Sequence, residues 1–409
     1  MAPRTSLVIG VFTLQIVLLT IGISRDYRLK HEDNNALHAT FARSHLHLGL
    51  SATRGQNYFY DPTRETGQFY ANHPPGPGLV LAAVYGLTGH DGPLTTRVTA
   101  IAFHLVAAWL FYGLARRVLA TRSEVLLAIV LFAILPESAF FGRMLNHEVL
   151  VLPAAILLVR GYWEFIDGTW PAGRSLTAIA AGAAWGAVSG WAGFFMIGAC
   201  GLHAIWEVWG RRNARAGVPL LLLFASGTLL LGLDLLHLLS VLGGDTAYLR
   251  DLLASRAGGL NAGDVGSWSG RIVELHWRYF GLTSAAGIGI LAYRKTAGSL
   301  GSRVDPAVEA GSVFLVAGAA YVLVFSFNAT AHDYWQFLLL PASVLGIVLI
   351  VRRITRGFGQ TRRPLLTRVL LAAVILDLTA VTTVTLVMRH MKSEGYCLEV
   401  VERLRRTAL

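Results

Sequence analysis

Two short polar runs in the first quarter of the chain carry the residue types best suited to chemistry. They are His31-Glu32-Asp33-Asn34-Asn35 and Asn72-His73-Pro74-Pro75-Gly76-Pro77-Gly78. A carboxylate held at a partly desolvated surface can act as a general base or bind a metal ion. Glu32 and Asp33 are therefore candidate bases, and the alternative is a solvated pair of loop charges. The prolines keep the second run extended, which leaves His73 at the head of the segment that follows.

The composition indicates what surrounds these runs. Of 409 residues, 54% are hydrophobic and 14% are charged, and the mean hydropathy is +0.54. A soluble domain of this size could not bury so much apolar surface, and several runs approach the roughly 20 residues needed to cross a bilayer. We therefore predict an all-α polytopic membrane protein. Its formal charge of +11 is explained by the positive-inside rule rather than by binding to nucleic acid.

Hydropathy divides the chain into about eleven membrane-spanning helices within a single domain, 1–409. The predicted spans are 7–23, 94–119, 125–141, 149–165, 176–189, 191–209, 218–236, 279–293, 311–327, 334–351 and 369–388. A further apolar run, 79–87, lies between Pro77 and Gly89 and is too short to cross a bilayer of about 30 Å. We predict that it forms a juxtamembrane helix within a long first loop, 24–92.

The distribution of arginine tests this topology. If 79–87 does not span, the basic segments all fall on one side of the membrane: Arg4, 116–122, Arg174, 211–215, 294–303 and 352–363. Asymmetry in Lys and Arg between loops sets orientation, so we expect a cytoplasmic N-terminus. The loops 24–92 and 237–278 and the tail 389–409 are then exoplasmic. Most of the thirteen histidines also fall on that outer side, although they were not used to assign it.

The order of these motifs resembles a known family. An acidic pair follows the first helix, a His-Pro-Pro sequence leads the short helix, and Thr96-Arg97-Val98 opens the next span. This combination resembles the GT-C superfamily, and within it the branch of protein O-mannosyltransferases and of the transferases that add aminoarabinose to lipid A. The resemblance covers residues 1–165 best and is looser in the remainder.

The resemblance implies a function and a location. Family members transfer a sugar, a hexose or a pentose, from a polyprenyl-phosphate donor to an acceptor hydroxyl, with inversion, at the exoplasmic face. It implies a multi-pass protein of the inner (plasma) membrane whose site is periplasmic. The catalytic carboxylate of the family's first loop corresponds to Asp33, with Glu32 as the second choice, and it would take the proton of the acceptor hydroxyl.

Other outer residues are candidates for binding substrate. His147 or Glu148 can orient the acceptor or a metal ion, although the start of a helix also favours an acidic residue. The leaving phosphate needs cations or hydrogen-bond donors. Candidates for that role are Arg143, Arg271, His276, Arg278 and His332. The run His332-Asp333-Tyr334-Trp335 resembles a late motif of the family, and its alternative is an interfacial aromatic belt.

A transporter or lipid flippase is the main alternative function. It predicts charges at mid-bilayer, internal repeats and broken helices. Here no repeat is evident and the ionisable residues gather on one side, which favours the enzyme; a non-catalytic relative is a second alternative. A divalent metal held by Glu32, Asp33, His73 or Glu148 stays open, and no other cofactor is indicated. The sugar, the acceptor and the oligomeric state are not determined by the sequence.

Overall fold

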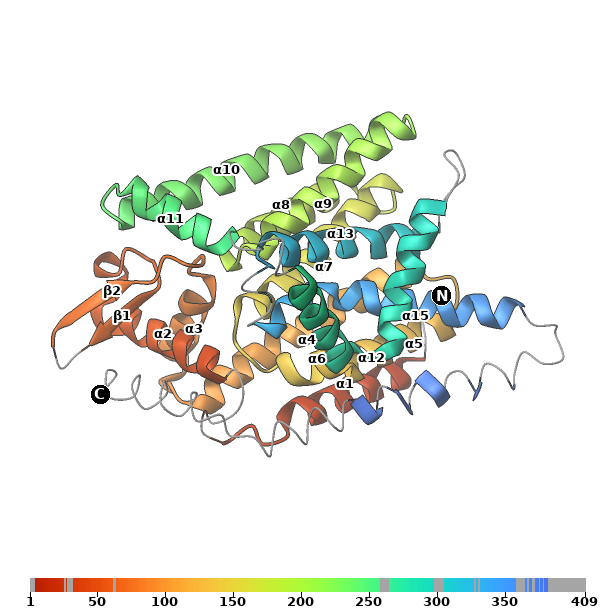
Figure 1. Ribbon diagram of the computed structural model, residues 1–409, viewed down its shortest axis with the longest axis horizontal. Helices are drawn as coiled ribbons and strands as arrows, with labels where there is room; N and C mark the ends of the chain where they lie inside the picture. Colours follow the sequence, from red (N-terminus) through yellow and green to blue (C-terminus); the bar gives the residue numbers. More distant parts are fainter. Residues whose placement is uncertain are drawn as a thin grey trace.

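The chain folds into a bundle of helices that carries a smaller helical layer at one end (Figure 1). The computed structural model describes residues 4–381, except 26, 28–31, 62–63, 258–264, 298–304, 327–328, 330–331, 358–364, 366–367, 370–371, 375 and 378. The predicted tail 389–409 lies outside the described residues. Elements of the first half are α1 (Thr5–Thr20), α2 (Glu32–Ala52), β1 (Tyr58–Asp61), β2 (Thr66–Phe69), α3 (Gly76–Thr88), α4 (Pro93–Val118), α5 (Arg122–Ile134), α6 (Pro136–Phe141), α7 (His147–Ile166) and α8 (Ala172–Ser189). Those of the second half are α9 (Ala192–Ile205), the π-helix η1 (Trp206–Gly210), the 3₁₀ turn η2 (Ala214–Ala216), α10 (Gly217–Val241), α11 (Thr246–Ala257), α12 (Val265–Ala297), α13 (Pro306–Val324), the 3₁₀ helix η3 (Asp333–Leu339) and α15 (Leu340–Gly357).

The prediction of a helical polytopic membrane protein is confirmed, but the count of eleven spans is not. Among the described residues, six helical segments are long and apolar enough to cross a bilayer. They are Pro93–Val118, His147–Ile166, Ala192–Gly210, Ala214–Val241, Pro306–Val324 and Tyr334–Thr355. The predicted span 125–141 is wrong as a single helix, because α5 ends at Ile134 and α6 begins at Pro136. Leu135 is extended (φ −55°, ψ 135°), as expected for a residue before proline.

The first loop contains more regular structure than its composition indicates. Its predicted short helix is present as α3, which starts after Pro75 and ends at Gly89 in the left-handed conformation (φ 68°). The loop also forms α2 and an antiparallel hairpin in which Tyr58 pairs with Phe69. The fold is therefore not purely α-helical. Similarly, the segment 237–278 is largely helical, because it contains the end of α10, α11 and the first half of α12.

Helix α7 forms the centre of the bundle and is buried on nearly all sides. It contacts α4, α8 and α9. Glycines allow this close packing, since a Cβ added at Gly182 of α8 would lie 2.7 Å from the backbone nitrogen of Leu158. Small residues at helix contacts are the usual way in which membrane helices approach closely. Glycines likewise allow α8 and α9 to approach closely, at Gly186 and Gly193.

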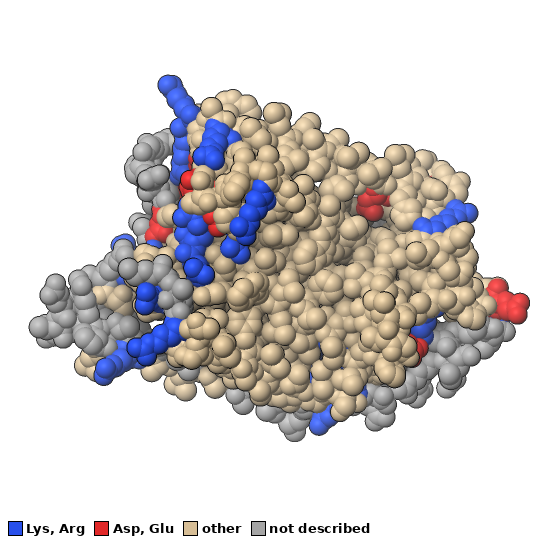
Figure 2. All heavy atoms as spheres, turned by 180° about the vertical axis from the view of Figure 1, so that it is seen from behind, with Lys and Arg blue, Asp and Glu red and all other residues tan. Residues whose placement is uncertain are grey.

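Positive charge gathers at one end of the molecule. In Figure 2 the Lys and Arg side chains cluster at the upper left, which is the end away from β1 and β2 in Figure 1. Arg352 of α15 pairs there with Glu124 at 2.8 Å and with Asp305. Arg211 likewise pairs with Glu309 at 2.7 Å. Among the described residues, Arg211 and Arg352, which the sequence assigns to one side of the membrane, are therefore both held in ion pairs with buried or partly buried acids.

The contact between Gly186 and Gly193 yields a stability prediction. Gly193→Ala places a Cβ against the backbone of Gly186, and we expect such overpacking to lower the free energy of unfolding by about 1–3 kcal/mol. Gly198→Ala is the control on the same helix, because a Cβ there meets nothing within 4 Å. The apparent unfolding temperature in detergent should fall for the first variant only. Equal values for the two variants would show that the contact does not limit packing.

Candidate active site

The centre of the candidate site is a buried ion pair between the first loop and α4. Arg97 donates from Nη2 to Oε1 of Glu32 at 2.8 Å and from Nε to the same oxygen at 3.2 Å. Arg97 is 0% exposed and Glu32 is 4% exposed. Arg97 also donates to the carbonyls of Ile23, at 2.7 Å, and of Arg25. Buried charges are tolerated only when they are paired and hydrogen-bonded, so this pair fixes the chain between α1 and α2.

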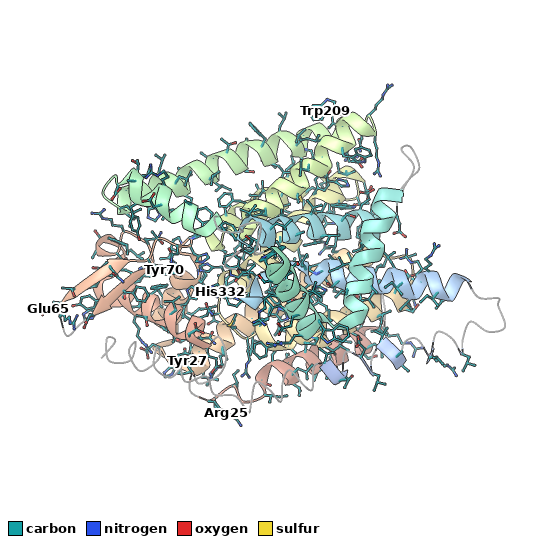
Figure 3. All side chains as sticks on the ribbon, viewed as in Figure 1. Arg25, Tyr27, Glu65, Tyr70, Trp209 and His332 are labelled. Carbon is teal, nitrogen blue, oxygen red and sulfur yellow. The ribbon has the colours of Figure 1, made fainter. Side chains whose placement is uncertain are left out.

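Hydroxyl groups extend the same anchor to α3. The hydroxyl of Tyr27 donates to Thr96 at 2.7 Å, and the hydroxyl of Tyr85 lies 2.6 Å from the same oxygen. The guanidinium of Arg97 lies over the ring of Tyr27, with Cζ 5.4 Å from the ring centroid. Burial raises the pKa of both tyrosines, so they stay protonated and can donate. Figure 3 shows Arg25 and Tyr27 together at the lower edge of this layer.

Arg143 supplies a second cation beside Glu32. It lies between α6 and α7, is 1% exposed, and donates from Nη1 to the carbonyl of Ile21. Its Nη2 is 4.0 Å from Oε1 of Glu32. Among the described residues, neither Nε nor Nη2 has a hydrogen-bond partner. Burial lowers the pKa of Arg143 to about 10, against the opposing effect of Glu32, so the group stays charged at neutral pH. Two guanidinium groups thus share one carboxylate.

The first turn of α2 is held from two further elements. Asn34 accepts a hydrogen bond from the hydroxyl of Tyr334 in η3 at 3.3 Å. Asn35 accepts one from the backbone nitrogen of Leu145, just before α7, at 2.7 Å. Asp33 lies between Glu32 and these amides and is only partly buried. The two neighbouring carboxylates therefore have different surroundings.

Histidines and aromatic rings pack beside this turn. His147 donates from Nδ1 to the carbonyl of Ser189 at 2.7 Å, if that nitrogen carries the proton. Its ring is stacked on His73, with centroids 4.2 Å apart, and lies 5.0 Å from His38 of α2. The ring of His73 is 6.3 Å from Trp335. The structure thus brings His73 of the His-Pro-Pro run to the predicted His147.

The late motif completes the same cluster. Trp335 stacks on Tyr321 of α13, with centroids 4.9 Å apart, and on His332 at 5.8 Å. Tyr321 donates to Oε1 of Glu148 at 3.1 Å. Figure 3 places His332 towards the middle of the molecule. We refer to His38, His73, His147, His332, Tyr321 and Trp335 as the histidine–aromatic cluster.

Glu148 is a buried carboxylate in the first turn of α7. It is 3% exposed, and among the described residues its Oε2 has no hydrogen-bond partner. The helix cap is supplied by Asn146, whose side chain accepts from the backbone nitrogen of Val149 at 2.9 Å. The helix start still favours the charge of Glu148. Glu148 is therefore not needed to cap α7, although the helix dipole favours a negative charge at this position.

The predicted cations of α12 lie in a different setting. Arg271 and Arg278 each pair with Glu274 at 2.7 Å and are partly exposed. Between them, Nδ1 of His276 lies 3.2 Å from Oε1 of Gln336 in η3, so this ring approaches the late motif. The backbone of Asp333 begins η3, and its side chain lies outside what the structure describes. Within the described part of the chain, no three His, Cys, Asp or Glu side chains are arranged to hold a metal ion.

Several residues of the site were not among those that the sequence predicts to act as a base or to bind substrate. His38, Asn34 and Asn35 lie on α2, in a segment that was predicted as a loop. The spacing of Asn34 and His38 by four residues places both on one helical face, but this signal has meaning only once the segment is known to be helical. Tyr321 lies within an apolar span and carries no sequence signal of its own.

Comparison with known proteins identifies the fold. No protein-family model matches the sequence, and no curated protein matches it. Among solved structures, ArnT from Cupriavidus metallidurans bound to undecaprenyl phosphate superposes with a TM-score of 0.61 at 12% identity, covering 99% of this chain and 76% of that one. The oligosaccharyltransferase AglB from Archaeoglobus fulgidus, in complex with an inhibitory peptide and a dolichol-phosphate, gives 0.58 at 13% identity.

The chain has the GT-C fold. It covers 55% of the length of AglB, and AglB covers 92% of this chain. The resemblance predicted from the acidic pair, the His-Pro-Pro run and Arg97 is therefore confirmed at the level of the fold.

The buried histidines of α2 predict that stability falls in acid. Burial lowers the pKa of His45 to about 4, and burial together with His147 holds the pKa of His38 well below its ordinary value. An unfolded histidine titrates near 6.5, so below that pH the unfolded state binds more protons than the folded state. Stability should be full above about pH 6.5 and should fall as the pH decreases towards 4.

The measurement is the apparent unfolding temperature of the purified protein between pH 7.5 and 4.5. We expect His45→Asn to show a shallower decrease than the unmodified chain. His47→Asn is the control, because His47 is an exposed residue of the same helix. A decrease that is equally steep in all three proteins would show that His45 does not contribute.

Proposed function

We propose that this chain is a membrane glycosyltransferase that moves a sugar from a polyprenyl-phosphate donor to an acceptor hydroxyl. The observation that carries the proposal is the arrangement at the start of α2, where Glu32 is buried between Arg97 and Arg143 and Asp33 is the more exposed neighbour. The GT-C fold supports it, since ArnT binds undecaprenyl phosphate and AglB a dolichol-phosphate. The site then needs a base, a cation for the leaving phosphate and a surface for the acceptor.

The charge distribution supports an exoplasmic site. The arginine-rich end in Figure 2 lies away from β1 and β2, and the loop that bears Glu32 and Asp33 belongs to the opposite layer. The positive-inside rule assigns the arginine-rich end to the cytoplasm. The candidate site then opens on the periplasmic side of the inner membrane, where acceptor glycans, lipids or proteins are accessible.

We assign the role of base to Asp33 rather than to Glu32. Oε1 of Glu32 already accepts two hydrogen bonds from Arg97. A carboxylate so deeply buried and paired serves to hold charge in place and cannot readily reach a substrate. Asp33 is less buried and adjoins the histidine–aromatic cluster through Asn34 and Tyr334. A general base must be able to approach the proton that it removes, and the less buried Asp33 is the more accessible of the two carboxylates.

The proposed reaction is a single displacement. Asp33 takes the proton of the acceptor hydroxyl as its oxygen forms a bond to the anomeric carbon. The bond from that carbon to the phosphate oxygen breaks on the opposite face, and its electron pair leaves with the polyprenyl phosphate. Opposite faces of attack and departure invert the anomeric configuration.

Arg143 is the cation that we assign to the leaving phosphate. Its Nε and Nη2 have no hydrogen-bond partner among the described residues, and it stays charged despite being buried. A preorganised donor aimed at developing negative charge is worth more in such a water-excluded place than in water. Arg271 and Arg278 are less suited to the role, because each is partly exposed and already forms an ion pair with Glu274 at 2.7 Å.

The first test is the release of free polyprenyl phosphate, measured by mass spectrometry. Purified protein in lipid would receive a panel of polyprenyl-phosphate sugars and a membrane extract as acceptor. We expect turnover that Asp33→Asn lowers by roughly 10²–10⁴-fold, the usual contribution of a general base. Glu32→Gln should instead reduce the yield of folded protein, since it leaves Arg97 buried without its charge partner.

Each other outcome of this assay contradicts part of the proposal. Turnover that survives Asp33→Asn and is lost in folded Glu32→Gln would move the base to Glu32. No turnover with any donor in the panel would contradict the transferase, and lipid flipping in vesicles would then be measured.

The assignment of Arg143 is tested separately. Arg143→Met should lower the transfer rate by roughly 10²–10³-fold, as expected for losing one preorganised donor to developing charge, while Arg143→Lys should recover part of it. Arg250→Ala is the control, because Arg250 is an exposed residue of α11 paired with Asp251. Gel filtration and the unfolding temperature would confirm that the variants fold. Unchanged turnover in folded Arg143→Met would remove Arg143 from the site.

A further inference from the structure

A second cluster of positive charge lies away from the candidate active site, where α4 and α7 end and α8 begins. Its centre is Trp170, in the turn between α7 and α8. The guanidinium of Arg174 lies over the indole ring at 4.0 Å from Cζ to the centroid, and that of Arg160 lies over it at 4.8 Å. Two planar cations thus share one aromatic ring, an arrangement that stabilises each cation but also brings their charges together.

Nearby acids do not balance this charge. Arg116, at the end of α4, and Arg174 both lie close enough to repel Arg160. Glu164 is 3.8 Å from Nε of Arg160, but it is shared with Arg117 at 3.7 Å. Asp167, the other carboxylate of this turn, pairs with Arg117. The excess of guanidinium groups costs free energy unless an anion lies among them.

The start of α8 adds donors to the same place. Arg174 is the third residue of the helix, where the dipole disfavours a cation. The preceding Pro171 provides no side-chain cap, so the backbone N–H groups of the first turn are not satisfied by capping. A Cβ added at Gly173 meets no atom within 4 Å, which shows open space beside this turn. An anion placed there would receive both backbone and guanidinium donors.

The position of Arg160 is built into the packing. A Cβ added at Gly113 of α4 would collide with the guanidinium group of Arg160. Among the described residues, Nε of Arg160 has no hydrogen-bond partner. Glycine at 113 therefore makes room for the guanidinium group of Arg160.

We propose that Arg116, Arg160 and Arg174, together with Trp170, bind the phosphate headgroup of an anionic phospholipid. Two candidate spans, α4 and α7, end here within the arginine-rich end of Figure 2, where the ends of membrane helices meet lipid headgroups. Tryptophan and arginine are the residues that favour this interfacial zone, and basic pockets between helices bind such headgroups. The positive-inside rule requires arginines in this loop but does not require two of them to share one ring. This site does not depend on the proposed transferase activity.

The experiment measures lipid binding to the full chain in neutral detergent by native mass spectrometry, with the unfolding temperature as a second readout. The three arms contain phosphatidylglycerol, phosphatidylcholine or inorganic phosphate. We expect phosphatidylglycerol to bind most tightly and to raise the unfolding temperature most. Arg160→Ala and Arg174→Ala should each weaken its binding about fivefold, which corresponds to about 1 kcal/mol for each basic residue at the headgroups.

Two further variants separate a site from a general surface potential. Gly113→Ala keeps every charge but displaces the guanidinium of Arg160, so it should also weaken binding. Arg353→Ala removes an exposed charge of α15 outside the cluster and should have little effect. Equal losses in Arg353→Ala and Arg174→Ala, or full binding by Gly113→Ala, would overturn the site. Equal affinity for inorganic phosphate and for phosphatidylglycerol would overturn the assignment to a lipid.

Discussion

The outer layer of this protein depends on one buried ion pair, between Arg97 and Glu32. Removing both charges from water is costly, and the hydrogen bonds that Arg97 donates to the backbone carbonyls of Ile23 and Arg25 help to offset that cost. The pair therefore fixes where α2 begins relative to α1 and α4. The position of α2 in turn brings Asn34 to η3, Asn35 to the start of α7, and His38 to His147. Without this ion pair, α2 would not be held in the position where these three contacts form.

Helix α7 connects the two regions of unusual charge. Its first turn carries His147 and Glu148 beside the histidine–aromatic cluster, and its last turns carry Arg160 and Glu164 beside Trp170. At 1.5 Å per residue, a 20-residue helix holds these ends about 30 Å apart, which is close to the thickness of a hydrocarbon core. Because α7 is buried almost throughout, neither end can shift without disturbing the packing on α4, α8 and α9. The same helix therefore positions part of the histidine–aromatic cluster at one end and Arg160 at the other.

The sequence was sufficient to predict the membrane class, α3 and the family resemblance, because these rest on long apolar runs and on proline and glycine. It was not sufficient for α2, whose inner face is formed by Asn35, His38 and His45 rather than by aliphatic residues. A helix that packs through polar groups has no apolar period to detect. The break at Pro136 was visible in the sequence, yet the apolar residues on either side gave the appearance of one span. Helix α11 and the part of α12 before the predicted span 279–293 were not predicted for the same reason as α2, because they are too polar for hydropathy to mark.

In the candidate site, too, the sequence indicates which residue types are present, but only the folded structure shows which of them interact. From the sequence alone, Arg143, Arg271 and Arg278 are equally good candidates for the cation that binds the leaving phosphate. The two arginines of α12 stand three and four residues from Glu274, a spacing that pairs them as soon as the segment is helical. Arg143 has no such neighbour, and tertiary packing buries it against Glu32 instead. Helical geometry also distinguishes Glu32 from Asp33. Successive residues of a helix point about 100° apart, so when Glu32 faces Arg97, Asp33 faces a different direction. Two adjacent carboxylates thereby come to lie in different surroundings, Glu32 buried and Asp33 only partly buried.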